Sequence, residues 1–172
     1  MPAAGRVEEP GGDGAEPPRG GRPSAIGQEL RQTRPFRSLG QEAFLALLRT
    51  TDVAKKRFSD LFATHGITFQ QYNVLRILRG AGEDGLPTLE VGERMIERTP
   101  GVTRIVDRLE KKGWVSRDRG VEDRRRVWCR ITGAGLELLE RLDPPVDATD
   151  AAIFSALEDG DLETLIRLLD AL

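Results

Sequence analysis

The 172-residue chain contains one His, one Cys and 38% hydrophobic residues, and its formal net charge is −2. A single cysteine excludes an intrachain disulfide framework, and the sequence offers neither a CxxC motif nor a Cys/His cluster as a metal site. No apolar run approaches the length of a membrane span, so we expect a cytoplasmic protein that needs no metal or other cofactor.

The charge is polarised along the chain, although its sum is close to zero. Residues 88–132 hold twelve Lys and Arg against eight Asp and Glu, whereas residues 133–172 hold two against ten. A basic segment followed by an acidic one is consistent with one surface that faces phosphates and another that faces away from them. The overall charge therefore does not exclude binding to nucleic acid.

The N-terminal stretch, residues 1–38, is rich in Gly, Pro, Arg and Glu and holds few large apolar side chains. Such a segment buries too little surface to offset the entropy lost on ordering, so we expect a tail that is disordered at least as far as Ser24. Residues 26–36 are candidates for a short arm that packs on a partner subunit.

Residues 39–66 predict a long first helix that ends at His65-Gly66. Apolar side chains recur along it at spacings of three and four, so they line one face, which we expect to bury against a second chain. They are Phe44, Leu47, Leu48, Ala54, Phe58, Leu61 and Phe62. His65 is interpreted as a residue of the helix end, because a catalytic base would need a partner that the sequence does not offer.

A second helix is expected after its cap at Thr68, followed by a short extended segment at residues 86–88. Thr88 is then expected to cap a helix over residues 89–97, the first helix of a helix-turn-helix. Gly92 lies in the middle of that helix, where glycine is unfavourable. We interpret its small size as room for the next helix to approach closely.

The stretch from 99 to 132 carries the sharpest signal in the chain. Thr99 is a suitable N-cap and Pro100 suits the first position of a helix. An apolar face then follows at helical spacing, made of Val102, Ile105, Val106 and Leu109. The opposite, polar face carries Gly101, Thr103, Arg104, Arg108 and Lys111. Gly113 supplies the C-terminal stop.

After Gly113, residues 114–117 and 127–131 are two short β-favouring runs joined by a basic loop. A helix followed by a basic hairpin is typical of a winged helix-turn-helix, in which the helix enters the major groove and the hairpin the minor groove. Arg104 is suited to contact guanine, and Thr103 a thymine methyl or a phosphate. The alternative left open is that Arg104 and Arg108 pair with acidic residues of their own helix.

The runs VTRIVDRLEKKGWV and EDRRRVWCRITGAG closely resemble the recognition helix and wing of the MarR family of bacterial transcriptional regulators. The family's wing carries an Asp-x-Arg element followed by a strand that ends in Leu/Ile-Thr, matched here by Asp123-Arg124-Arg125 and Ile131-Thr132. The likeness covers roughly residues 39–172. One departure is Val91-Gly92, where family members often have Leu-Ala.

The resemblance implies roles for the loop residues. Arg125 would enter the minor groove, and Asp123 would stabilise the wing by pairing with a nearby Arg. Arg124, Arg126 and Arg98 are candidates for phosphate contacts, which fix register without reading sequence. The complete set of candidate DNA-binding residues is Arg98, Thr99, Pro100, Gly101, Thr103, Arg104, Arg108, Arg124, Arg125 and Arg126.

Residues 133–172 are expected to form helices that bury against a second copy of the chain. Thr132 caps the first of them, and Pro144-Pro145 is expected to kink or interrupt it. The apolar stripe of the last helix, residues 162–172, is too broad and too terminal to be covered within a small wing domain. The resemblance implies a homodimer built from the first and last helices.

The expected fold is mainly α (α+β), a winged helix-turn-helix with long N- and C-terminal dimerisation helices. Its parts are a tail (1–38), a dimerisation helix (39–66), a DNA-binding lobe (67–132) and C-terminal dimerisation helices (133–172). By resemblance, it is a sequence-specific regulator of double-stranded DNA, a dimeric repressor responsive to a phenolic or carboxylic effector. The alternative is a winged-helix module for protein association. No catalytic motif favours an enzyme.

Overall fold

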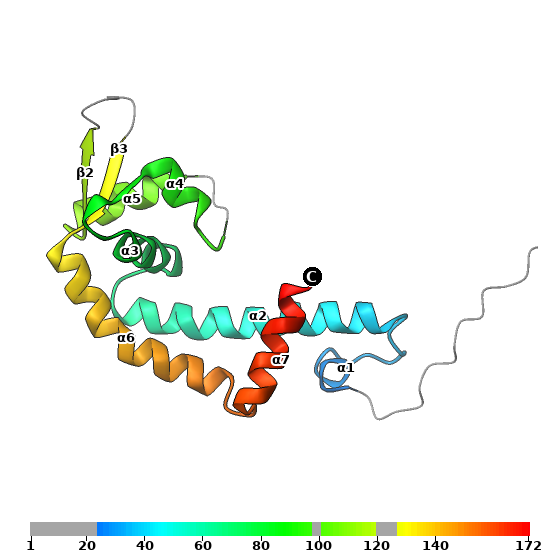
Figure 1. The fold of residues 1–172 in the computed structure, drawn as a ribbon. Helices are drawn as coiled ribbons and strands as arrows, with labels where there is room; N and C mark the ends of the chain where they lie inside the picture. The colour runs from blue at the N-terminus through cyan, green and yellow to red at the C-terminus, as the bar shows by residue number, and fades with distance from the viewer. Residues whose placement is uncertain (1–23, 98–100, 120–126) are drawn as a thin grey trace, which may run out of the picture. The chain divides into compact units, whose positions relative to one another are not determined.

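The structure, a computed structural model, describes residues 24–97, 101–119 and 127–172 (Figure 1). The chain divides into two compact units, Met1–Thr50 and Thr51–Leu172. Across the described ranges the protein is mainly helical and has one small antiparallel sheet, which confirms the predicted fold class. None of the helices in these ranges combines the length and the apolar character that crossing a membrane requires.

The first unit contains the short helix α1 (Ala25–Glu29) and the N-terminal half of the long helix α2 (Leu39–Thr64). Glu29 at the end of α1 forms an ion pair with Arg49 of α2. Three of the apolar residues on this half of α2 are exposed in the single chain: Phe44, Leu47 and Leu48. This half of α2 therefore presents an apolar stripe to solvent.

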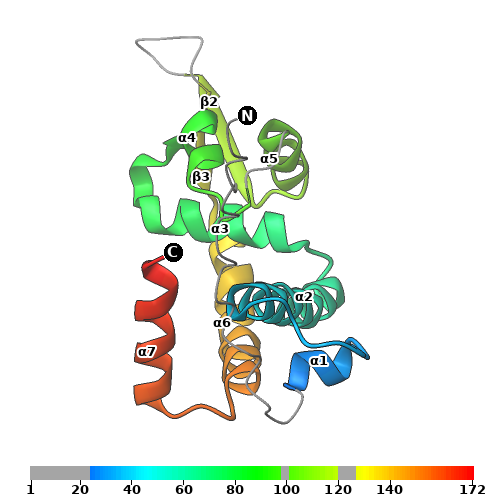
Figure 2. The same ribbon diagram turned by 90° about the vertical axis from the view of Figure 1, so that its right-hand side faces the viewer.

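The second unit begins in α2 and contains the predicted wing lobe. Its further elements are α3 (Phe69–Ala81), a 3-10 turn (Gly82–Asp84), β1 (Leu86–Pro87), α4 (Thr88–Glu93), α5 (Val102–Lys111), β2 (Val115–Arg119), β3 (Val127–Ile131), α6 (Gly133–Ile153) and α7 (Asp159–Asp170). The predicted cap of α3 is confirmed, because the Thr68 hydroxyl accepts from the Gln71 N–H at 3.2 Å. In Figure 2, β2 and β3 lie side by side with α5 next to them.

The sheet has the strand order β1-β3-β2, and both pairings are antiparallel. β2 pairs with β3 from Val115 opposite Ile131, and β1 adds Leu86 opposite Cys129. Gly85 precedes β1 with a φ of +67°, and a Cβ there would overlap the Cys129 carbonyl oxygen. Glycine at this position therefore allows β1 to approach β3, as expected for the short strand that completes a wing.

A hydrophobic core joins α3, α5, α6 and the sheet to the last turns of α2. Its fully buried large side chains are Phe62, Leu75, Leu78, Leu109, Leu139 and Leu142. Aromatic rings continue the core toward α2, where Phe62 stacks on Tyr72 with ring centroids 4.5 Å apart. Buried apolar area of this kind contributes most of the stability of a small domain. The core fixes α5 through its inward residues Val106 and Leu109, as the helical spacing predicted.

α6 runs as one helix from Gly133 to Ile153 through Pro144 and Pro145, so of the two predicted effects an interruption is wrong, and a kink stays a prediction. A proline removes the hydrogen bond to the carbonyl four residues earlier. Those carbonyls belong to Glu140 and Arg141, both exposed residues, so water can satisfy them. Leu139, Leu142 and Val146 on the other side of the helix stay buried and hold it together.

α4 differs from its prediction in length and in its cap. It ends at Glu93 rather than near residue 97, and Pro87 rather than Thr88 occupies the N-cap position. The Thr88 hydroxyl instead donates to the Val127 carbonyl at 3.2 Å and lies 3.3 Å from the Cys129 sulfur. The Thr88 hydroxyl therefore links the start of α4 to β3 instead of capping the helix.

The last helix, α7, is capped by Glu158 and Asp161 as a capping box and has no buried residue. Its apolar stripe is exposed in this single chain, with Ile166 59% and Leu168 55% accessible. The position of the helix and the spacing of its apolar residues follow the prediction. No residue in the described part of the chain buries its apolar face.

Candidate nucleic-acid interface

The polar face of α5 is exposed, as the sequence predicts. Thr103, Arg104, Arg108 and Lys111 all lie on the solvent side, opposite the buried Val106. The helix starts later than expected, because Gly101 is its N-cap and has the left-handed φ of 108°. A residue in that conformation cannot belong to the helix, so the cap predicted at Thr99 is wrong and Gly101 lies just before the helical face.

The two carboxylates of α5 are engaged by a residue of the wing. Arg117 on β2 lies 2.5 Å from an Asp107 carboxylate oxygen, and its Nε donates to Glu110 at 2.9 Å. The hydrogen bond with Glu110 raises the pKa of the Arg117 guanidinium, which burial alone would lower. In the described ranges, neither carboxylate pairs with Arg104 or Arg108.

This arrangement decides the alternative that the sequence left open. The acidic residues of α5 point toward β2, so the outer face keeps its positive charge unneutralised by its own helix. Sequence reasoning missed Arg117 as a supporting residue of the interface. Its signal was present, because the Gly113 turn brings a strand back along α5 and so places a cation opposite Asp107 and Glu110.

At the base of the wing, β3 is joined by side-chain contacts to β2 on one side and to the 3-10 turn on the other. On β3, Arg130 pairs with Asp118 of β2 at 2.7 Å, and its Nε donates to the Glu83 carbonyl at 2.9 Å. The predicted wing-tip residues Asp123, Arg124, Arg125 and Arg126 lie outside the described residues, as do Arg98, Thr99 and Pro100. Their roles in DNA binding stay predictions.

The close approach expected at Gly92 is present. A Cβ on Gly92 of α4 would lie 3.1 Å from a methyl carbon of Val102 at the start of α5. That separation is tighter than ordinary van der Waals contact, so a larger residue would push the two helices apart. The departure from the Leu-Ala pair of the family is thus used for helix packing.

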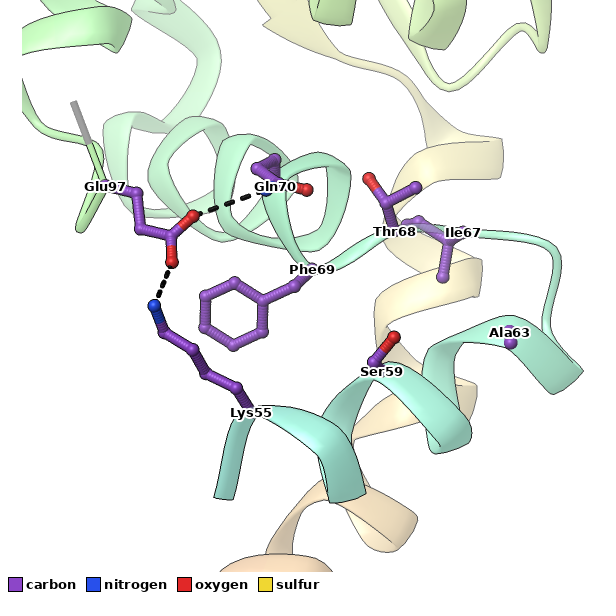
Figure 3. Close-up of a pocket in the computed structure, with 8 residues that line it drawn as sticks. All are labelled: Lys55, Ser59, Ala63, Ile67, Thr68, Phe69, Gln70 and Glu97. Atoms are coloured by element: carbon purple, nitrogen blue, oxygen red, sulfur yellow. Dashed lines mark hydrogen bonds and ion pairs between the residues drawn. The ribbon is translucent and has the colours of Figure 1, made fainter. Parts of the chain in front are cut away.

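A pocket of about 360 Å³ lies beside the start of α3 (Figure 3). It is lined by Lys55, Ser59 and Ala63 of α2, by residues 67–70, and by Glu97. Lys55 and Glu97 form an ion pair with a 2.5 Å separation, and Gln70 donates to Glu97 at 3.3 Å. Phe69 and Ile67 supply an apolar wall, so the pocket combines an ion pair with apolar surface.

Cys129 is fully buried on β3, and the pKa of its thiol is raised because burial disfavours the thiolate. We therefore expect Cys129 to react at least about tenfold more slowly with a disulfide reagent in the native protein than in urea. The measurement is the rate of thionitrobenzoate release, with free cysteine in both solvents as the control. Equal rates after this correction would contradict the expectation and show an accessible, reactive thiol.

Comparisons with known proteins agree on one family. Residues 67–127 match the model of the MarR family. A crystal structure of a MarR transcription factor from Planctomyces limnophilus is 39% identical, with a TM-score of 0.63, and the match covers 80% of this chain and 100% of that one.

Two further relatives bear on function through their names. The homoprotocatechuate degradative operon repressor of Escherichia coli is 25% identical over 126 residues, which covers 73% of this chain and 84% of that protein. The structure of an S. aureus MepR–DNA complex is 25% identical with a TM-score of 0.64, and the match covers 74% of this chain and 96% of that one.

Proposed function

The chain belongs to the MarR family of transcriptional regulators, and from this premise we propose that it is a repressor that binds a pseudo-palindromic DNA operator as a homodimer. The observation that carries the proposal is the exposed cationic face of α5, whose carboxylates are engaged by Arg117. Support also comes from the E. coli relative named as a repressor and from the MepR relative solved with DNA. A role on DNA supports a cytoplasmic, non-enzymatic protein.

The proposed contacts follow from position and chemistry. Arg104 has the fork of donors that recognises guanine, and Thr103 beside it suits a thymine methyl or a phosphate. Arg108 lies further along the same face and suits a phosphate. For Arg98, Thr99, Pro100, Gly101 and the wing arginines 124–126, the proposal rests on the family resemblance.

The homodimer is supported by apolar surface that a single chain leaves exposed. α7 presents Ile166, Leu168 and Leu169, and the N-terminal half of α2 presents Phe44 and Leu48. Exposed apolar helix faces, each considered by itself, are typical of interfaces between subunits. A two-fold axis would then place two α5 helices about one helical turn of DNA apart, which requires a pseudo-palindromic site.

The pocket beside Lys55 supports a small-molecule effector. Lys55, which is ion-paired with Glu97, lies in the same pocket lining as Phe69 and Ile67. The pocket therefore suits a ligand that joins an apolar ring to a carboxylate or phenolate able to compete with Glu97 for Lys55. Such a ligand weakens DNA binding only if it binds more tightly to a conformation that fits the operator poorly. We propose a phenolic or carboxylic effector on this basis.

The proposal is tested by selecting genomic fragments with the purified protein and measuring affinity for the enriched site across a salt series. We expect a pseudo-palindrome, a steep loss of affinity with salt, and a loss of about tenfold in Arg125→Ala at fixed salt. Fluorescence anisotropy provides the affinities, and a scrambled duplex is the control. No enriched sequence, together with binding indifferent to Arg125, would favour a winged-helix module for protein association.

A further inference from the structure

We propose that Lys55 and Glu97 are positioning residues for DNA binding, because their ion pair holds Glu97, five residues before α5, against α2. The inference rests on the proposed function, since it takes α5 as the helix that reads DNA. Neither residue belongs to the exposed face of α5, so both would act through the placement of that helix rather than through contact with DNA.

The pair joins parts of the second unit that are far apart in sequence. Lys55 Nζ lies 2.5 Å from Glu97 Oε1, across the pocket shown in Figure 3. Gln70 at the start of α3 donates to the other oxygen of the same carboxylate at 3.3 Å. The hydrogen bond from Lys55 holds the pKa of Glu97 below its usual range, so the carboxylate is charged at neutral pH.

Contacts on both sides of α5 make the placement specific. Next to Glu97, the backbone N–H of Ile96 donates to the Asn73 side chain of α3 at 3.0 Å. Just after α5, Lys112 Nζ donates to the carbonyl of Gly66, two residues beyond the end of α2, at 2.5 Å and lies 4.6 Å from the centroid of the Trp114 ring. Because α5 starts only five residues after Glu97, loss of the Lys55 contact removes one of the contacts that hold the chain before the helix, while Lys112 keeps its contact after the helix.

Reading base edges requires α5 to keep its orientation in the groove, and two copies must keep it at once. A partly exposed ion pair adds little to the stability of the fold. Its effect on the affinity for DNA is counted twice, because each protomer of the dimer carries one such pair. We therefore expect the pair to affect affinity while leaving thermal stability nearly unchanged.

The charge of Glu97 distinguishes positioning from a direct electrostatic effect. Removing a negative charge near a DNA-binding helix should tighten binding if only the field matters. If Glu97 acts by holding the segment before α5, its removal should weaken binding instead. The two explanations predict changes of opposite sign.

The test measures operator affinity by fluorescence anisotropy for Glu97→Gln, Lys55→Gln and the charge-reversed pair Lys55→Glu/Glu97→Lys. We expect each single variant to bind about threefold more weakly per protomer, or about tenfold for the dimer, with the salt slope of the wild type. The charge-reversed pair should recover most of the loss. The matched control is Lys56→Gln, because Lys56 pairs with Asp60 at 3.0 Å entirely within α2.

Thermal melts of all variants establish that each is folded. Glu97→Gln binding as tightly as the wild type or more tightly, or Lys56→Gln losing as much affinity as Lys55→Gln, would overturn the inference. A salt slope reduced by Lys55→Gln would show that Lys55 contacts phosphate and would also overturn it. Failure of the wild type to select any operator would instead contradict the proposed function itself.

Discussion

Replacing Gly135 with alanine is expected to lower the free energy of unfolding by about 3 kcal/mol. Gly135 lies in the first turn of α6, where a Cβ would overlap the Trp114 carbonyl oxygen and approach a side-chain carbon of Ile131 to 2.7 Å. The first obstacle is backbone and cannot rotate away. The Trp114 carbonyl also accepts from the Thr132 N–H at 3.0 Å, so displacing it loosens the start of α6.

Gly133→Ala is the matched control for this prediction. Gly133 lies two residues earlier in the same helix, and a Cβ there would meet nothing within 4 Å. Alanine at an open helical position should stabilise by up to about 1 kcal/mol. Urea unfolding of both variants, at one fixed protein concentration because a dimer is expected, gives the two free energies. Similar values for the two variants would show that α6 does not approach Trp114 closely.

Replacing Arg104 with alanine is expected to weaken operator binding by at least about thirtyfold while leaving the fold intact. Arg104 is exposed on α5, and a bidentate contact to guanine is worth about 1–3 kcal/mol in each half-site. The two half-sites of a dimeric complex double that loss. Because Arg104 is not needed for the core, its thermal unfolding should match that of the wild type.

The measurement compares affinities for the selected operator and for operators with single base-pair changes. The variant should discriminate less at one position of each half-site, whereas loss of a phosphate contact weakens all sequences alike. Arg141→Ala is the control, because it removes the same charge from an exposed position on α6. Equal losses for the two variants would mean that only net charge matters and that Arg104 reads no base.

Much of the local structure was predictable because it depends on neighbouring residues. The cap at Thr68, the stop at Gly113 and the spacing of Val106 and Leu109 each act within one or two turns of chain. These features located α3, α5 and the strands that follow. The exposed face of α5 followed directly, since it is the side opposite the apolar stripe.

The errors in the predicted helices arose where the local preference of a residue differs from the contacts that it or its neighbours make with distant parts of the chain. Thr88 suits a helix cap, yet its hydroxyl is taken by β3 across 39 residues of chain. Pro144 and Pro145 disfavour a helix locally, yet buried leucines around them keep α6 continuous. In each case the stabilisation from tertiary contacts was larger than the local conformational preference, which is worth only a few kcal/mol.

The sequence by itself determined the order of the elements, the cationic face of α5 and the resemblance that led to the family, because these features are written in short-range patterns. Only the tertiary structure decided which charges neutralise one another. It paired Asp107 and Glu110 with Arg117, leaving Arg104 exposed, and it joined Lys55 to Glu97 across the pocket. Ion pairs depend on which elements the core brings together, and that depends on packing among residues distant in the chain.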